Sequence, residues 1–273
     1  MNILGALERH ESFMSTFIAP RHVDVWYPPG YFENTAECYP VIYMHDGQNL
    51  FDSATAFGGS GWEIDKTIVQ LMDAKKICGA MVVGIWNTDM RWREYMPQKP
   101  YQSLALERHH ENFINTYGGE PVSDAYLRFI VEELRPFIDA NYRVFADQPN
   151  TFVMGSSMGG LVSLYAISEY PEIFGGAGCL STNWPAGENE LVDEMAKNLP
   201  DPQTHKLYFD YGTEGLDAFY GPYQKRMDEH LRGAGYLDNV NLMTLQFAGA
   251  DHSENAWRER VEIPLSFFLS CLK

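Results

Sequence analysis

The sequence contains no apolar stretch that approaches the roughly 20 residues needed to cross a bilayer. Its first ten residues, MNILGALERH, also lack the basic segment followed by an apolar run that marks a secretory signal. These two absences argue against a membrane-spanning helix and against export. We therefore expect a soluble, cytoplasmic protein without a membrane partner.

Basic residues are scarce. Lysine and arginine together number 20, against 37 aspartate and glutamate residues, which gives a net charge of -17 at pH 7. A field of this sign repels the phosphates of nucleic acids and anionic membrane surfaces. We therefore expect no nucleic-acid partner. A neutral small-molecule substrate suits such a field, which would also expel a carboxylate product.

Cysteines are few and far apart in the sequence. None shows the close CxxC spacing that is typical of zinc or redox sites. We expect free thiols in a reducing compartment, with Cys78 and Cys179 in the core because both adjoin apolar runs. The four positions are Cys38, Cys78, Cys179 and Cys271.

What the sequence does contain is a regular alternation of strand and helix patterns. With 45% hydrophobic residues and no break in composition, the chain predicts a single domain over residues 1–273. Apolar runs predict strands at residues 21–27, 41–44, 80–86, 151–154, 176–180, 206–211 and 240–247. Alternation with helices predicts an α/β fold, with a mostly parallel central sheet, helices on both faces and functional loops at the carboxyl ends of the strands.

Apolar side chains recur at helical spacing between these strands, at residues 64–72, 126–138, 161–167, 223–232 and 261–268. Ser123 or Asp124 is expected to cap the second of these helices, and Pro136 to kink or break it. Two stretches lack such a pattern. Residues 87–121 read as a long irregular connection, of the kind that is usually functional or mobile, and residues 183–204 as a polar insertion.

The chain is organised around the sequence GSSMG at residues 155–159. In the GxSxG nucleophile elbow, a strand turns sharply into a helix and lifts the central serine, here Ser157, above the sheet. The flanking glycines are needed because a side chain would clash at the turn. An apolar strand precedes the motif and an amphipathic helix pattern follows it, as the elbow requires.

A serine nucleophile needs a histidine to accept its proton. Eight histidines are available, and position separates them. His205 precedes its strand, His230 lies within a predicted helix, and five others come before Ser157. The expected order is serine, acid, histidine, so His252, in a loop at the carboxyl end of the last strand, is the candidate base.

The acid of the triad is expected in the loop that follows residues 206–211. That loop holds two carboxylates, Glu214 and Asp217. Glu214 lies nearer the strand end, whereas Asp217 could turn back beneath the histidine. The residues alone leave both open. The loop at Ser181 has no carboxylate and is not expected to supply the acid.

The reaction also needs N–H donors for a developing oxyanion. Met158 supplies one by its place after the serine. Gln48 is expected to supply the second, because Gly47 lets the loop after residues 41–44 turn inward. An alternative use of His45, Asp46 and Asp52 as metal ligands matches no known spacing, so we expect no metal and no cofactor.

Aromatic and polar residues are expected near the same edge of the sheet. Asn87 and Arg91 follow a strand, and Trp62 and Trp184 flank it. Aromatic faces with polar neighbours suit sugar or aryl rings, and Arg91 or Arg93 could instead pair with a substrate carboxylate. The alternative is that the tryptophans are plain core and that the arginine is a solvated surface charge.

Taken together, these residues resemble the putative esterase family of α/β-hydrolases, which includes esterase D, feruloyl and acetyl-xylan esterases of carbohydrate esterase family 1, and siderophore esterases. The resemblance covers nearly the whole chain. It is carried by His252 and by four stretches: VDVWYPPGY at 23–31, YMHDGQNLF at 43–51, GSSMGG at 155–160 and DYGT at 210–213.

The resemblance implies an α/β-hydrolase fold with Ser157 as nucleophile, His252 as base and Gln48 with Met158 as oxyanion donors. The Gly-Thr turn followed by Leu216 and Asp217 looks like the acid loop of the family and favours Asp217. The family often has an acid three residues after the turn glycine, where this chain has Gly215.

The expected activity is that of a serine carboxylesterase that acts on feruloyl or acetyl esters of carbohydrates, with acylated oligosaccharides as possible substrates. Siderophore esters and thioesters are alternatives, as is acyl transfer to an acceptor other than water. From another class, the rival is a non-catalytic binding protein on the same fold. The sequence is silent on oligomeric state.

Overall fold

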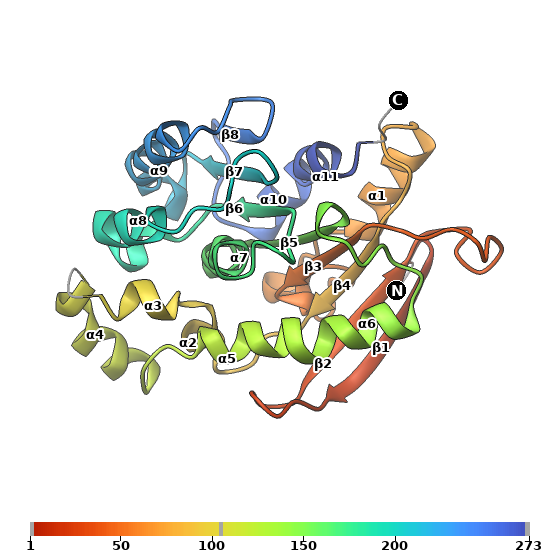
Figure 1. Ribbon diagram of the computed structural model, residues 1–273, viewed down its shortest axis with the longest axis horizontal. Helices are drawn as coiled ribbons and strands as arrows, with labels where there is room; N and C mark the ends of the chain where they lie inside the picture. The colour runs from red at the N-terminus through yellow and green to blue at the C-terminus, as the bar shows by residue number, and fades with distance from the viewer. Residues whose placement is uncertain (1–2, 104–105, 271–273) are drawn as a thin grey trace.

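The computed structural model describes residues 3–103 and 106–270. Eight strands within these residues form one sheet, in the order β1-β2-β4-β3-β5-β6-β7-β8 (Figure 1). The pairs β1–β2 and β2–β4 are antiparallel and the others are parallel, so the prediction of a mostly parallel sheet is confirmed. The strands are β1 Ala6–Phe13, β2 Arg21–Tyr27, β3 Val41–His45, β4 Met81–Ile85, β5 Thr151–Ser156, β6 Gly176–Leu180, β7 Lys206–Gly212 and β8 Leu242–Phe247.

The strand β1 was not predicted. It lies at the edge of the sheet, pairs with β2 alone and is nowhere fully buried. Its centre holds Glu8, Arg9, His10 and Glu11, which interrupt any apolar run. An edge strand needs little apolar surface, because only one of its sides pairs, so hydrophobicity gives no signal for it.

Helices cover both faces of the sheet, as predicted. One face carries α5 Ser123–Arg128, α6 Arg135–Asn141, α7 Met158–Glu169, α8 Glu188–Ala196 and α9 Gly221–Gly233, and the other carries α1 Ile64–Asp73, α10 Glu254–Arg260 and α11 Glu262–Leu269 (Figure 1). The chain thus has the α/β-hydrolase fold.

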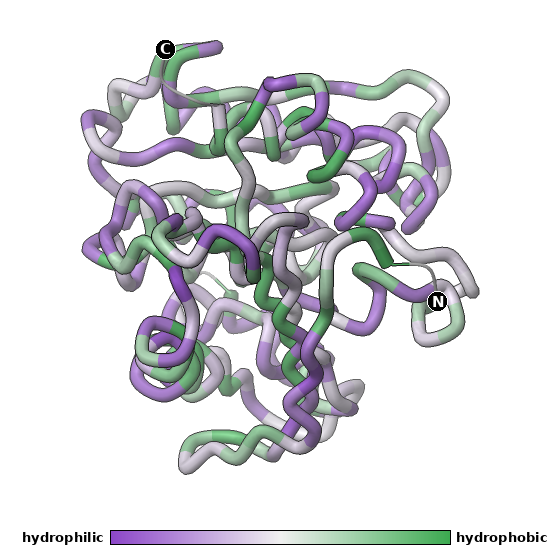
Figure 2. The backbone as a smooth tube through the Cα atoms, turned by 90° about the vertical axis from the view of Figure 1, so that its right-hand side faces the viewer, coloured by the Kyte–Doolittle hydropathy of each residue, from purple (hydrophilic) through white to green (hydrophobic). Residues whose placement is uncertain are grey.

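Two buried apolar clusters lie on opposite sides of the sheet. Tyr43 and Val83 belong to the first cluster, and their neighbours Ile42 and Val82 to the second. Successive side chains of a strand point to opposite faces, so a strand covered on both sides must be apolar throughout, as β3 and β4 are. In Figure 2 the backbone is green, or hydrophobic, along several inner segments and purple, or hydrophilic, along many outer ones.

Residues 87–121 are not an irregular loop, and that prediction is wrong. They include three short helices, α2 Arg91–Tyr95, α3 Gln98–Tyr101 and α4 Glu107–Tyr117. Figure 1 shows α3 and α4 beside the sheet, away from its centre. Buried aromatic side chains hold this segment, among them Tyr95, Tyr101 and Phe113. Pro97 precedes α3 and Pro100 lies within it, and α2 and α3 are too short for their periodicity to be recognised.

Residues 123–141 run as α5, a π-helical turn Phe129–Leu134, and α6. The N-cap residue of α5 is Val122, so neither Ser123 nor Asp124 occupies the predicted capping position. Ser123 Oγ instead accepts a hydrogen bond from the Gln98 N–H at 2.9 Å. Pro136 falls within the first two residues of α6. Its missing N–H therefore coincides with the change from π- to α-helical hydrogen bonding.

Cys179 is buried and free, and Cys38 is exposed and free. Cys78 is exposed and disulfide-bonded, so the predictions of a free thiol and a core position are wrong for it. Its run of apolar neighbours belongs to β4, which begins at Met81. Cys271 lies outside the described residues. Among the described helices, none has the length and apolar character to span a membrane.

Candidate active site

Ser157 occupies the sharp turn between β5 and α7. Its backbone has φ 58° and ψ -120°, a conformation that L-residues rarely adopt. A Cβ on Gly155 would lie 2.9 Å from the carbonyl carbon of Gly159, closer than packing allows. Gly155 therefore permits the strand to approach the helix at Gly159, and the turn has the form predicted from GxSxG.

His252 lies in the loop between β8 and α10 and is hydrogen-bonded to Asp217. The distance from His252 Nδ1 to Asp217 Oδ1 is 2.6 Å. Asp217 itself lies in the loop after β7, and its side chain is buried. Glu214, the alternative acid, is exposed. Of the two carboxylates left open by the residues, the structure brings Asp217 to the histidine.

The carboxylate of Asp217 is held at both oxygens. Its Oδ2 accepts hydrogen bonds of 2.6 Å from Ser181 Oγ and from the Gly212 N–H. Burial alone would raise the pKa of Asp217, but the bonds from His252, Ser181 and Gly212 outweigh it and lower that pKa below its ordinary value. Asp217 therefore stays ionised and can fix the tautomer of His252 with the proton on Nδ1.

Ser181 was set aside at the sequence level because its loop has no carboxylate, yet it supports Asp217. Ser181 Oγ accepts hydrogen bonds from Trp257 Nε1 at 3.0 Å and from Arg260 Nη2 at 2.8 Å. Both donors come from α10, which follows His252 directly. One hydroxyl therefore links the acid to the helix that carries the histidine loop.

Ser157 and His252 line one cavity of about 400 Å³. Within the described part of the chain, no hydrogen bond joins their side chains. Such bonds are often long in enzymes without substrate. The other residues that line the cavity include Asp46, Gln48, Asn49, Phe57, Asn87, Arg91, Trp92, Glu254 and Trp257.

Tyr220 packs beside the histidine. Its ring meets the His252 ring edge-on with centroids 5.5 Å apart, and Tyr220 Oη donates to Asn183 Oδ1 at 3.1 Å.

Of the two predicted oxyanion donors, Gln48 lines this cavity and Met158 directly follows Ser157, which lines it. Gln48 lines it, and its side-chain Oε1 accepts a bond from the Asn87 N–H at 3.1 Å. Gly47 packs so closely on β4 that a Cβ would lie 2.5 Å from the Gly84 carbonyl carbon. Met158 is the first residue of α7, where an N–H has no acceptor within the helix and stays available to a ligand.

Arg91 and Asn87 line the cavity as predicted, but both are bound to Asp46. Arg91 Nε and Nη2 contact the two oxygens of Asp46 at 2.8 and 2.7 Å, and Asn87 Nδ2 lies 2.6 Å from Asp46 Oδ1. Burial opposes ionisation of Asp46, but Arg91 outweighs it and lowers the pKa of Asp46. Two of the guanidinium nitrogens are thus already paired.

The metal alternative finds no support in the geometry. His45 Nδ1 is bonded to Tyr126 Oη at 2.8 Å, and Asp46 is paired with Arg91. A different group of possible ligands, His109, Glu188 and Glu190, lies at the surface outside this cavity. Arg108 already forms ion pairs with both of its glutamates.

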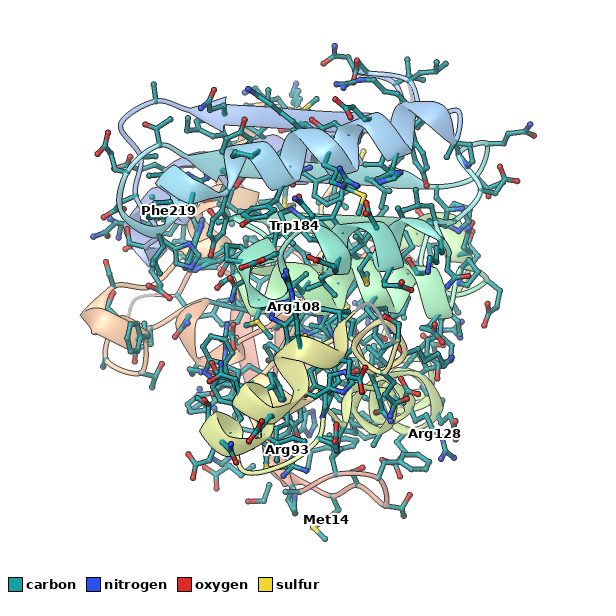
Figure 3. All side chains as sticks on the ribbon, turned by 90° about the vertical axis from the view of Figure 1, so that its left-hand side faces the viewer. Met14, Arg93, Arg108, Arg128, Trp184 and Phe219 are labelled. Carbon is teal, nitrogen blue, oxygen red and sulfur yellow. The ribbon has the colours of Figure 1, made fainter. Side chains whose placement is uncertain are left out.

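Trp62 and Trp184 do not line the Ser157 cavity, so they lie away from the substrate position predicted for them. Trp184 is fully buried and donates from Nε1 to Gln224 Oε1 at 3.0 Å. In Figure 3 the label of Trp184 lies near the middle of the view, and those of Phe219 and Arg93 lie to its left and below it. Trp62 is buried under the ring of Trp257, with centroids 5.8 Å apart. The plain-core alternative describes both tryptophans.

Sequence reasoning missed several residues that face or support the site, and it considered Asp46 only as a metal ligand. Glu254 is two positions after His252, so its proximity to that histidine was the available signal. Trp257 lies one helical turn beyond Ser253, the N-cap residue of α10, whose Oγ accepts from the Ala256 N–H. Nothing in the local sequence around Tyr220 indicates that it packs against His252.

The chain matches the model of the family described as Putative esterase over residues 15–262. It therefore belongs to the putative esterase family. It is 25% identical to the uncharacterised protein YbbA of Bacillus subtilis (strain 168) over 255 residues, which cover 91% of this chain and 90% of YbbA. It is 30% identical to the ferri-bacillibactin esterase BesA of the same organism over 156 residues, 54% of this chain and 49% of BesA.

Solved esterase structures share the fold of this family member. A ferulic acid esterase superposes with a TM-score of 0.70 at 16% identity, and the match covers 98% of this chain and 99% of that one. At such identity the likeness concerns the fold alone. The α/β-hydrolase fold and the esterase family inferred from the sequence are both confirmed, and the family match supports a carboxylic ester hydrolase.

Proposed function

We propose that this esterase is a serine carboxylesterase in which Ser157, His252 and Asp217 form the catalytic triad. The observation that carries the proposal is the 2.6 Å bond from His252 to a buried, ionised Asp217, in a cavity that His252 shares with a strained serine elbow. Such an arrangement suits removal of a proton from a serine hydroxyl. The non-catalytic alternative would leave the strained elbow without a purpose.

In the proposed reaction, Ser157 Oγ attacks the carbonyl carbon of the ester and transfers its proton to His252 Nε2. The backbone N–H groups of Gln48 and Met158 stabilise the oxyanion. The C–O bond to the alcohol then breaks, and His252 returns the proton to the leaving oxygen. Water, deprotonated by His252, attacks the acyl-enzyme and releases the carboxylic acid and free Ser157.

For the substrate, we propose aryl or short acyl esters of carbohydrates, feruloyl and acetyl esters first. The aromatic side chains of Phe57, Trp92 and Trp257 in the cavity suit a ring stacked beside the serine, and a structural neighbour is a ferulic acid esterase. A siderophore ester is the second candidate, because BesA, a 30% identical relative over half the chain, is a ferri-bacillibactin esterase. We further propose that residues 1–273 act as one domain.

The test of the nucleophile is intact-protein mass after exposure to a fluorophosphonate. We expect one adduct on the wild type and none on Ser157→Ala, with the adduct mapped to Ser157. Ser156→Ala serves as the matched control and should still react. Ser156 is the last residue of β5 and directly precedes Ser157. A folded wild type without an adduct, or an adduct that persists in Ser157→Ala, would contradict the proposed mechanism.

A further inference from the structure

Glu254 places a carboxyl group in the same cavity as Ser157 and His252, and no step of the proposed reaction uses it. It is the first residue of α10, two positions after His252. The Ser253 side chain caps this helix by accepting from the Ala256 N–H at 3.3 Å, which fixes where the helix begins. The position of Glu254 at the cavity wall is therefore set by the same cap that ends the histidine loop.

One oxygen of this carboxyl group is anchored by Asn49. Asn49 Nδ2 donates to Glu254 Oε1 at 3.2 Å, while Asn49 Oδ1 accepts from the Phe57 N–H at 2.9 Å. The second contact orients the amide, because its oxygen must face the backbone N–H and its NH₂ group must face Glu254. The carboxyl group also accepts from its own backbone N–H, and among the described contacts no other residue binds the second oxygen, Oε2.

Glu254 lies near the charge of Arg91 but forms no direct ion pair with it among the described residues. Arg91 is the cavity-lining cation, and Asp46 already binds it through two nitrogens. In residues 3–103 and 106–270, no basic side chain forms an ion pair with Glu254. Burial and the nearby Asp46 charge raise the pKa of Glu254, and the opposing effects of its own backbone N–H, His252 and Arg91 only partly offset them.

We propose that Glu254 is a specificity-determining residue that selects uncharged, hydroxyl-bearing esters and rejects esters that carry a second, anionic group. The inference rests on the proposed function. A hydroxyl group of the substrate can donate to the open Oε2, and a bond to an ionised acceptor is stronger than one between neutral groups. A substrate carboxylate or phosphate would instead be desolvated next to a like charge.

The size of this discrimination follows from one interaction. A hydrogen bond to a charged group, or one close like-charge contact in a partly desolvated cavity, corresponds to about a 10- to 100-fold change in kcat/KM. The net charge of -17 adds a long-range repulsion of anions that depends on the whole chain. The local effect must therefore be separated from the global one by a control of equal charge.

The experiment measures kcat/KM of the full chain for two esters, 4-nitrophenyl butyrate and 4-nitrophenyl hemisuccinate. Their acyl groups differ only at the end, which is a methyl group in the butyrate and a carboxylate in the hemisuccinate. In Glu254→Gln the ratio of kcat/KM for the butyrate to kcat/KM for the hemisuccinate should fall about tenfold or more. The amide oxygen of the glutamine can still accept the hydrogen bond from Asn49. Glu259→Gln, an exposed residue on the same helix, removes the same net charge and should leave the preference unchanged. Glu254→Ala removes the charge with a different side chain and should repeat the effect.

A second arm compares glyceryl monobutyrate with propyl butyrate. Glu254→Gln should lower the preference for the glyceryl ester about tenfold, because the hydroxyl groups lose their ionised acceptor. An unchanged preference in both arms would overturn the inference while esterase activity persists. An equal change in Glu259→Gln would also overturn it, because net charge alone would then explain the result. A folded wild type that hydrolyses none of these esters would overturn the proposed function itself.

Discussion

Ser181 Oγ lies 2.6 Å from Asp217 Oδ2, the carboxylate oxygen that does not bind His252. The same hydroxyl accepts hydrogen bonds from Trp257 and Arg260 of α10. Because Ser181 follows β6 and Asp217 follows β7, this one oxygen ties two strand ends to the helix beyond the histidine. The orientation of the acid thus depends on a residue that has no acid–base role of its own.

Ser181→Ala should lower kcat/KM about tenfold, because Asp217 loses a donor and gains freedom to rotate away from His252. The free energy of unfolding should fall by about 1 to 3 kcal/mol, because the buried Trp257 N–H loses its acceptor. Steady-state kinetics and urea unfolding measure the two effects. Ser168→Ala, whose buried hydroxyl has no partner among the described residues, is the matched control. A fully active and equally stable Ser181→Ala would contradict this role.

The choice of acid is tested by a pair of isosteric changes in one loop. Asp217→Asn should reduce kcat about 10⁴-fold, because the amide no longer holds His252 in the tautomer that accepts a proton. Glu214→Gln should leave kcat within about twofold of the wild type, since its side chain is exposed. Single-turnover rates with an aryl ester measure both. The reverse pattern would assign the acid to Glu214.

The elbow could be predicted from the sequence because its physics is local. Gly155 and Gly159 are needed within five residues of one another, and the strand and helix around Ser157 have their own apolar patterns. His252 could be predicted for a related reason, since chain order and strand ends exclude the other histidines. The residues alone left the acid open, because the choice between Asp217 and Glu214 depends on how the loop packs on Ser181 and Gly212. The family resemblance favoured Asp217, the residue that the structure brings to His252.

Burial of aromatic residues was the other point that sequence reasoning could not settle. A tryptophan near a strand end fits a substrate wall or a core equally well. Trp184 is core because Gln224, 40 positions later, offers an acceptor for its N–H. The helices α2 and α3 were likewise hidden, because they are very short and are stabilised by the tertiary packing of Tyr95 and Tyr101. The amphipathic pattern of α4, by contrast, is present in the sequence and was missed.

The Asp46–Arg91 pair should couple strongly in a double-mutant cycle. Arg91→Gln leaves a buried carboxylate unpaired beside the proposed oxyanion hole, where its charge opposes the developing oxyanion, so kcat/KM should fall about 10- to 100-fold. Asp46→Asn should cost less, because it leaves a cation there. The double variant should lose less than the sum of the two single changes. Additive losses in kcat/KM would show that the two side chains act independently.

The last prediction concerns His45, which ends β3 just before the proposed oxyanion loop. Burial lowers the pKa of His45 to about 3, whereas a histidine in an unfolded chain has a pKa near 6.5. The folded state therefore binds fewer protons than the unfolded state between about pH 6.5 and pH 3, and stability must fall as the pH falls through this window. For one group the slope is about 1.4 kcal/mol per pH unit.

His45→Gln removes this group and should make the free energy of unfolding less pH-dependent by about that slope between pH 6 and pH 4, while an amide can still bond Tyr126. Urea unfolding at several pH values measures the slope. His22→Gln changes a partly exposed histidine on β2, which β4 separates from β3 in the sheet, and provides the comparison. If His45→Gln and the wild type lose stability in parallel as the pH falls, His45 is not held neutral by burial. The loss of unfolding free energy at low pH would then come from the titration of other groups.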